Sequence, residues 1–544
     1  MRNPQSSIPS WILCLALSVV LGPILARAQD NAGASSQSRP VPGKPRFNIY
    51  EFRVTGNSVL ETTAVERSVY PYLGDGKTID DVEAARGALE QAYHDKGFST
   101  VSVVIPEQQV KDSTVLLHVV EGSVEAVQVL GAKYYSQGRI LEKVPEFAEG
   151  KVPSFPVAQQ QLASVNDGPD RTVTPLLRPG KLPGTVDVDL NVTDQLPLHG
   201  SVSLTNDYTP NTTAARLTAG VEYDNLFQRQ QRLALLYQMS PQNIDQVKLW
   251  SVAYTIPLTG QFLALSFVRS DSATIAGLGG VSVFGRGKIV GLHDILLLPA
   301  RAPTEGSTFS QNLNIGLDYK AFDQNIQVGS SPADGFATPV SYAPLSAYYN
   351  ATWTRGANQW DFGTGLEFAL RGVGSTPAQF DAKRYQALDN FAIFRMNVDR
   401  SQELPGQFSL LAKLDVQLAD QPLVSNEQLV VGGVDSVRGY LTASETGDSG
   451  ARVSIELHSP KLTEGLAPVS EMLGLVFVDG AYARILSPLP DQKSSYELLS
   501  AGVGLRAKAD KSASLAVDLG WPMRAVPFTR AWSPRLQAGL VFTY

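Results

Sequence analysis

From about residue 200 onward, the chain consists of segments in which apolar and polar residues alternate. In residues 407–423, QFSLLAKLDVQLADQPL, every second residue from Phe408 to Leu418 is apolar, and Lys413 and Asp415 lie between them. The same period of two returns in residues 247–258 and in the last segment, PRLQAGLVFTY. A period of two is the signature of a β-strand with two different faces. The C-terminal part of the chain is therefore predicted to be all-β.

Two architectures fit such strands. A soluble sandwich buries its apolar faces, whereas a transmembrane barrel turns them to lipid and keeps a polar lumen. These segments run to about 9–11 residues, the length that a tilted membrane strand needs, whereas soluble strands average about five or six. Aromatic residues mark both segment ends, and the final strand ends in Tyr544. At roughly 20 residues per strand and connection, residues 197–544 allow about sixteen antiparallel strands. We therefore expect a membrane all-β barrel.

The N-terminal 28 residues are typical of a secretory signal peptide. Arg2 gives a basic start, an apolar core follows up to Leu25, and Ala26-Arg27-Ala28 is a small-x-small cleavage pattern. An uncleaved anchor helix, the alternative, would need closer to ~20 apolar residues. The chain's single cysteine, Cys14, lies inside this segment, so the mature chain should have no disulfide, thiolate metal site or cysteine nucleophile.

The charge of the chain argues against nucleic-acid binding. The formal net charge is −7, whereas nucleic-acid binders present a basic face. Charged residues make up 18% of the chain, fewer than in most soluble domains. The mean hydropathy of −0.06 is too low for a helical membrane protein.

Between the signal peptide and the barrel, the pattern predicts two consecutive α+β modules. Residues 29–45 are rich in Ser, Ala, Gly and Pro and read as a disordered lead-in. Residues 46–121 follow the order strand, helix, strand, strand, with Asp80 as the expected helix N-cap. Residues 122–196 repeat that order loosely.

No constellation of an enzyme or a cofactor site stands out. The five histidines are scattered without ligand spacing, and no Gly-x-Ser-x-Gly elbow is present. The stretch GLGGVSVFGRGK, residues 277–288, lacks the GK-Ser/Thr ending and the following helix of a phosphate loop, so a barrel loop is expected instead. We expect no catalytic residues, no metal and no cofactor.

The stretch VGGVDSVRGYLTASE, residues 431–445, is unusual among the barrel connections. Its glycines permit a tight fold-back, but no helix follows that could support phosphate binding. A plain surface turn would not need an arginine between Val437 and Gly439. We therefore expect a long loop, near residues 431–450, that carries Arg438 inward.

The element VRGY, formed by Val437, Arg438, Gly439 and Tyr440, resembles the signature of the two-partner secretion transporters of the Omp85 superfamily. FRVTGNSVL with VVIPEQQV and VLLHVVEG, and VQVLGAKYYS with residues 171–197, look like two POTRA domains, at 46–121 and 122–196. Residues 202–227 are similar to the family's entry into the barrel, and AGVGLR and AVDLGWPM to its penultimate strands.

In that family the loop arginine pairs with an acidic residue of a Phe-x-Asp-x-Gly motif on the inner barrel wall. Here LVFVDGAYAR offers Phe477 and Asp479, but its glycine, Gly480, comes one position early. The resemblance therefore implies a pair of Arg438 with Asp479. It leaves open whether that pair only stabilises the barrel or acts in transport.

The resemblance implies a pore in the outer membrane of a Gram-negative bacterium, with its POTRA domains in the periplasm. Such a pore secretes one exoprotein partner, held unfolded in the periplasm, and we expect it to be monomeric and in contact with outer-membrane lipid and lipopolysaccharide. An Omp85-type assembly factor is the alternative, although such factors usually have three to five POTRA domains. A passive porin would account for neither the modules nor the loop. Related transporters often plug the pore with an amphipathic helix, but residues 29–45 carry three prolines and no apolar stripe, so no plug is expected there.

Overall fold

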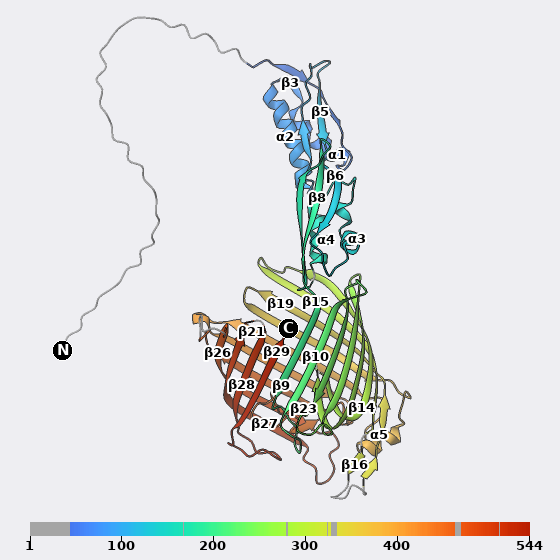
Figure 1. The fold of residues 1–544 in the computed structure, drawn as a ribbon, viewed down its shortest axis with the longest axis vertical. Coiled ribbons are helices and arrows are strands. Elements are labelled where there is room, and N and C mark those ends of the chain that lie inside the picture. The colour runs from blue at the N-terminus through green and yellow to red at the C-terminus, as the bar shows by residue number, and fades with distance from the viewer. Residues whose placement is uncertain are drawn as a thin grey trace, which may run out of the picture. The chain divides into compact units, whose positions relative to one another are not determined.

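The computed structural model describes residues 44–166, 168–278, 281–323, 325–327, 335–462, 469–510 and 512–544. The predicted signal peptide and residues 29–43 of the predicted lead-in lie outside these ranges. The described chain forms two compact units, residues 44–96 with 101–120 and residues 97–100 with 121–544 (Figure 1). Within the described ranges, no helix is both long and apolar enough to cross a bilayer.

The first unit is an α+β module. Its central sheet has the order β2-β5-β4, with β2 parallel to β5 and β4 antiparallel to it. Strands β1 and β3 form a separate antiparallel pair. The elements are β1 (Phe47–Ile49), β2 (Glu51–Thr55), α1 (Thr62–Val69), β3 (Gly74–Lys77), α2 (Ile79–Asp95), β4 (Ser102–Val104) and β5 (Thr114–Val120).

Helix α2 begins earlier than the sequence predicts. Its N-cap is Thr78, not Asp80, because the Thr78 backbone N–H donates to Asp81 Oδ2 at 2.8 Å and closes a capping box. The apolar stripe of α2 faces the module core, as its spacing predicts, and consists of the buried residues Val82, Ala85, Leu89 and Tyr93.

The second module, which belongs to the second unit, repeats the topology of the first. Its sheet has the order β6-β8-β7. As β2 is parallel to β5 in the first module, so β6 is parallel to β8 in the second. Gly56 follows β2 and Gly131 follows β6, and both have a φ of 85°. A Cβ on Gly56 would meet the carbonyl oxygen of Val119 on β5, and a Cβ on Gly131 would meet that of Val192 on β8. The elements are β6 (Ser123–Leu130), α3 (Gln137–Lys143), α4 (Phe155–Val165), β7 (Arg171–Pro179) and β8 (Thr185–Asp194).

The rest of the second unit is a closed antiparallel barrel of 16 strands, as predicted. Strands β18 and β19 continue each other across Ala343 and together make one of the 16. The described barrel strands are β9 (Leu198–Thr205), β10 (Arg216–Leu226), β11 (Gln231–Met239), β12 (Lys248–Leu258), β13 (Gln261–Leu278), β14 (Val281–Arg301), β15 (Ser307–Phe322), β18 (Val340–Tyr342), β19 (Pro344–Arg355), β20 (Asn358–Ala369), β21 (Ala392–Glu403), β22 (Ser409–Ala419), β25 (Ser449–His458), β26 (Glu471–Arg484), β27 (Ser495–Ala509), β28 (Ala513–Pro522) and β29 (Arg535–Thr543).

Alternation along these strands separates a lipid-facing from a lumen-facing side. Leu418, Val476 and Phe542 are about half exposed on the outside, whereas Asp479, next to the exposed Val478, is fully buried in the lumen. The last strand, β29, pairs with β9 and closes the barrel. The residues Gln261–Leu278 and Val281–Arg301 are strands, so most of the predicted loop at 277–288 is instead part of β13 and β14.

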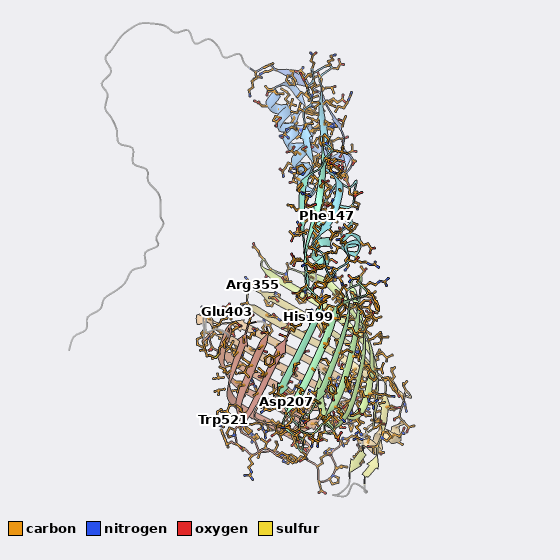
Figure 2. All side chains as sticks on the ribbon, viewed as in Figure 1. Phe147, His199, Asp207, Arg355, Glu403 and Trp521 are labelled. Atoms are coloured by element: carbon orange, nitrogen blue, oxygen red, sulfur yellow. The ribbon has the colours of Figure 1, made fainter. Side chains whose placement is uncertain are left out.

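The two ends of the barrel differ. The end at which β9 follows the second module, here called the module end, carries His199, Arg355 and Glu403, and the opposite, loop end carries Asp207 and Trp521 (Figure 2). Helix α5 (Pro377–Lys383) lies in a connection at the loop end.

The lumen is not polar throughout, contrary to the prediction. Towards the loop end, inward side chains of β12 to β18 pack against residues of the connections and form an apolar cluster. It includes Leu249, Val268, Ile289, Phe322, Tyr342, Phe380, Phe391 and Leu423. The alternation could not reveal this cluster, because its partners come from connections that fold onto the strands.

Candidate functional site: an inward-folded loop and its binding site in the barrel wall

The connection between β22 and β25 folds back on itself and carries the VRGY element. Two short strands, β23 (Leu429–Val431) and β24 (Glu445–Gly447), pair as its stem. Gly432, at the end of the stem, has a φ of 99°, and a Cβ there would lie 2.6 Å from the Leu441 carbonyl oxygen. The turn therefore requires glycine at this position. We call residues 429–447 the inward loop.

Arg438 is buried against the barrel wall, with 3% of its surface exposed. Its Nε and Nη2 donate to Oδ2 and Oδ1 of Asp479, each at 2.7 Å, and its backbone N–H donates to Oδ2 at 3.0 Å. Asp479 itself is fully buried on β26. Such a bidentate, charge-assisted pair fixes both the position and the orientation of the arginine.

Two more carboxylates surround the same guanidinium. Arg438 Nη1 lies 2.8 Å from Glu456 on β25 and 3.8 Å from Asp518 on β28. Asp518 is also bound by Arg506. Sequence reasoning missed these residues. Alternation places Glu456 and Asp518 in the lumen, but only the stagger of neighbouring strands decides which inward residues reach the loop.

The electrostatics of this site keep Arg438 charged. Burial alone lowers the pKa of the guanidinium, but the hydrogen bond to Asp479 and the charges of Asp479, Glu456 and Asp518 outweigh it and raise the pKa of Arg438. The inward loop is therefore held by a permanent charge that does not titrate in the physiological range.

Phe477 forms the floor of the arginine site. The guanidinium carbon of Arg438 lies 3.6 Å from the centre of the Phe477 ring, in cation–π geometry. Behind the ring, a Cβ on Gly502 of β27 would come within 2.3 Å of Phe477 Cζ. Gly502 therefore provides the room in which the ring lies flat against the wall.

Gly439 and Tyr440 bind the last strands of the barrel. Gly439 donates its N–H to Gln537 Oε1 on β29 at 2.8 Å, and a Cβ on Gly439 would lie 3.0 Å from the backbone of Gly520 on β28. The buried Tyr440 hydroxyl lies 3.0 Å from the carbonyl oxygen of Leu499. Val437 packs with Tyr440 in an apolar cluster under the loop stem.

Gly480, the glycine that comes one position early, takes no part in this site. It follows the inward Asp479, so it faces outward, where a Cβ would make ordinary contacts with Val453 and Leu499. The position two residues after Asp479 holds Ala481, which is buried and packs in the same cluster as Tyr440. A small inward side chain therefore occupies the place of the motif's glycine, and β26 stays regular.

A second contact of the same connection was not predicted. Glu427, just before the stem, is 3% exposed and accepts from Lys320 Nζ at 2.7 Å and from the Tyr342 hydroxyl at 2.6 Å. Glu367 on β20 binds the same lysine at 3.2 Å, and Arg395 on β21 binds both glutamates. The loop connection is thus bound to two sectors of the wall, β25–β29 and β15–β21.

One group of described residues has donors suitable for a metal, namely Asp170, His199 and Asp224, whose ligand atoms all lie within 4.8 Å of one another. His199 Nε2 lies 3.0 Å from Asp170, which also accepts from Gln195. Asp224 pairs with Arg232 at 3.0 Å. Each of the two carboxylates thus already has a partner within the protein. The three residues link the end of the second module to the first barrel strands.

A closed barrel of 16 strands that follows α+β modules and holds an arginine loop in its lumen defines an outer-membrane transport protein of the Omp85 type. Two family models then specify the branch. The POTRA domain, ShlB-type, matches residues 47–122, and the haemolysin secretion/activation protein ShlB/FhaC/HecB matches residues 341–507. The chain belongs to the two-partner secretion transporters, which lie in the outer membrane and secrete a partner exoprotein.

Relatives that are similar over most of their length support this assignment. A heme/hemopexin transporter protein, HuxB of Haemophilus influenzae, is 21% identical over 86% of this chain and 82% of its own length. The outer membrane transporter CdiB of Dickeya dadantii is 20% identical over 88% of this chain and 83% of its own. The solved structure of CdiB from Escherichia coli has the same fold, with a TM-score of 0.62 and 17% identity over 94% of this chain and 93% of that one.

Proposed function

We propose that this transporter exports one large partner protein as an extended chain, and that the inward loop sets the width of the pore. The observation that carries the proposal is the buried Arg438–Asp479 pair, which holds a long connection inside the barrel. Residues 122–196 act as a second POTRA domain, because their sheet repeats the strand order of the first module. Residues 197–544 are the pore, and folding of the cargo outside the cell provides the direction of transport.

Capture of the cargo takes place at a free sheet edge of the second module. Strand β7 is a poor edge for pairing because Pro175 and Pro179 lack backbone N–H donors. Strand β6 lies at the other edge of the sheet, and only its first residues are covered, by hydrogen bonds between Val124 and residues 150–151. An extended cargo segment can add to β6 through main-chain hydrogen bonds.

A cross-linking experiment tests this edge. Gln128→Cys on β6 and Gln160→Cys on α4 place the same thiol at exposed positions of one module. With a cargo stalled during export, Gln128→Cys should cross-link to it and Gln160→Cys should not. Equal cross-linking of both variants, or of neither, would contradict capture at β6.

The role of the inward loop is tested with Arg438→Ala. Removing one partner of a buried ion pair costs about 3–5 kcal/mol and leaves Asp479 without its cation. Secretion of the cargo should fall while the protein remains in the outer membrane. Arg452→Ala is the matched control, because Arg452 is another arginine of the lumen wall that pairs elsewhere, with Asp415 at 3.2 Å. Wild-type secretion by Arg438→Ala would refute the role.

A second experiment separates a fixed stabilising pair from a moving loop. The Thr442 hydroxyl donates to Asp207, which lies beyond the end of β9. A disulfide between Thr442→Cys and Asp207→Cys tethers the loop to the barrel. If the loop must move during export, oxidation should stop secretion and reduction should restore it, with both single variants unaffected. Undiminished secretion by the oxidised protein would show that the loop only stabilises the barrel.

An assembly factor for other barrels is the second candidate, because BamA from Haemophilus ducreyi shares the fold, with a TM-score of 0.56 over 92% of this chain. Depletion of the protein separates the two functions. Under our proposal the levels of other outer-membrane barrels stay constant while the cargo disappears from the medium. We further propose that the transporter works as a monomer and binds lipopolysaccharide, since its single barrel is closed and its outer face is apolar.

A further inference from the structure

Three outward rows of side chains cross strands β13, β14 and β15 near the loop end. Residues paired across antiparallel strands share one face of the sheet. The first row, Phe267, Val290 and Tyr319, is apolar and aromatic, and each of its side chains is about 40% exposed or more. One step closer to the loop end, Arg269 pairs directly with Lys288. The basic row therefore lies where the lipid-facing surface ends.

The pairing of Arg269 with Lys288 places two positive charges directly opposite each other, an arrangement that destabilises a sheet. Arg269 donates from Nε to Asp271 Oδ2 at 3.2 Å, and the side chain of Asp271 is 44% exposed. Lys288 makes no ion pair with any residue that the structure describes. Lys288 therefore lacks a counter-ion among the described residues, and an anion between the two side chains would offset the repulsion of the facing cations.

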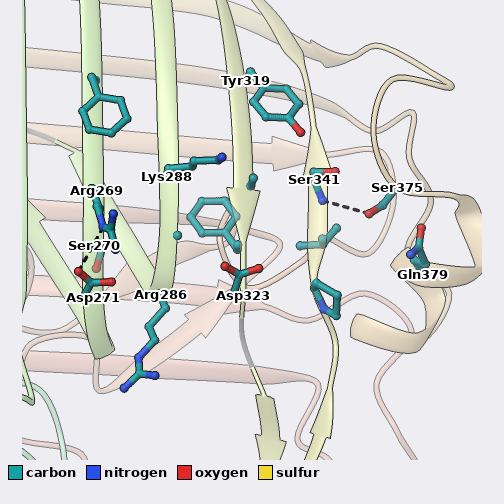
Figure 3. Close-up of a pocket in the computed structure, with 16 residues that line it drawn as sticks. Arg269, Ser270, Asp271, Arg286, Lys288, Tyr319, Asp323, Ser341, Ser375 and Gln379 are labelled. Atoms are coloured by element: carbon teal, nitrogen blue, oxygen red, sulfur yellow. Dashed lines mark hydrogen bonds and ion pairs between the residues drawn. The ribbon is translucent and has the colours of Figure 1, made fainter.

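A hollow of about 790 Å³ opens over these residues, and Figure 3 shows Arg269, Lys288 and Tyr319 around it. On the side away from Arg269, it is bounded by Ser341 and by Ser375, whose hydroxyl accepts from the Ser341 backbone N–H at 3.1 Å. The third row, nearest the loop end, contributes Arg286 together with Asp271 and Asp323. The hollow thus offers three cations, two carboxylates and hydroxyl groups above an aromatic floor.

We propose that this hollow binds the phosphorylated sugar headgroup of an outer-leaflet glycolipid of the lipid A type, with a phosphate between Arg269 and Lys288. The loop end faces the outside of the cell, since the second module, which leads into β9 at the other end of the barrel, is periplasmic. The three rows therefore face the outer leaflet, and the inference rests on this orientation. Phosphate oxygens bind arginine and lysine strongly. The acyl chains of the same molecule lie along Phe267, Val290 and Tyr319, which a free phosphate would leave exposed.

The test measures lipid binding to the purified full-length protein by native mass spectrometry. The probes are bis-phosphorylated lipid A, dephosphorylated lipid A and inorganic phosphate. The wild-type protein should retain the bis-phosphorylated lipid, and the double variant Arg269→Gln/Lys288→Gln should bind it at least about tenfold more weakly. Arg301→Gln, on the same strand but at the module end, is the matched control and should bind normally.

The outcomes of this experiment test the proposal and distinguish a lipid headgroup from a free anion. Equal retention by the double variant and the wild type would overturn the proposal, as would equal binding of dephosphorylated lipid A. Inorganic phosphate that displaces the lipid completely would show a site for a free anion. Lys288→Arg, which keeps the charge, should keep binding, so a loss caused by misfolding is recognised. Secretion should persist in the double variant, because neither side chain faces the lumen, and a failure of the transport proposal would leave the binding result unchanged.

Discussion

Gly439 and Gly480 each follow one partner of the Arg438–Asp479 pair along the chain, but they meet opposite constraints. Gly439 has a φ of 88°, and a Cβ there would press on the backbone of Gly520 at 3.0 Å. Gly480 has ordinary space around it. We expect Gly439→Ala to lower the free energy of unfolding by roughly 1–3 kcal/mol and to reduce secretion. Gly480→Ala should stay within about 0.5 kcal/mol of the wild type.

Urea unfolding of the refolded protein in lipid vesicles measures both substitutions. Equal destabilisation by the two alanines would show that the close approach of Gly439 to β28 does not hold the loop.

Glu445, in the loop stem, gives the fold a dependence on pH. It is half-buried, one of its oxygens accepts no hydrogen bond from a described residue, and burial raises its pKa from 4.5 to about 7, although Lys493 opposes this. Its protonated form is thus favoured in the folded protein, so its contribution to stability is complete below about pH 4.5 and is lost as the pH rises through about 7.

The wild type should therefore lose stability between pH 5 and pH 8 relative to Glu445→Gln, which stays neutral throughout. Thermal unfolding midpoints of both proteins at the two pH values provide the measurement. The same pH slope in both would exclude Glu445 as the source.

The residues of the arginine site differ in how far the sequence could name them. Arg438, Asp479 and Phe477 stand in short motifs, and the structure brings these three together. Glu456 and Asp518 belong to no motif, and their approach to Arg438 depends on the register of four strands, β25 to β28. A period of two gives the face of a residue but not its height in the barrel.

At the scale of elements, the connection between β22 and β25 is bound at two separate places. Glu427 binds Lys320 on one side, and Arg438 binds Asp479 on the other. Loss of either contact should free only part of the connection. We expect Glu427→Gln and Arg438→Ala each to widen the pore slightly and the double variant to widen it by more than the sum, since the two contacts restrain one segment.

Single-channel conductance in planar bilayers gives the pore width. Glu403→Gln, an exposed change at the module end of β21, serves as the control and should leave the conductance unchanged. A strictly additive double variant would mean that the two contacts act independently.

The elements themselves were largely predictable, because alternation over 9–11 residues has few structural solutions. The number of barrel strands is as predicted. The first module also contains the antiparallel pair of β1 and β3, which the predicted order did not include. The apolar cluster in the lumen was not predictable, since Phe380 and Phe391 lie in connections that carry no period. These two side chains pack against inward residues of several strands, and only the closed barrel brings those strands around them.

At the scale of the whole molecule, the first unit has its own core. Its buried residues, such as Leu89 and Leu117, belong to α2 and β5 of that unit. Deleting residues 44–120 should therefore leave a barrel with native heat-modifiable migration and native conductance, but should abolish secretion. A barrel that fails to assemble without these residues would contradict this independence.

The arginine site also determines when, during assembly of the barrel, the inward loop can bind. Its walls come from β25 to β28, and Gly439 binds Gln537 on β29, the last strand of the chain. A nascent barrel that still lacks its final two strands has no Asp518, Gly520 or Gln537 to receive the loop. The loop can therefore bind its complete site only after the last two strands have been added. Binding of the loop thus follows completion of the barrel, and in an unfinished barrel the loop does not yet narrow the pore.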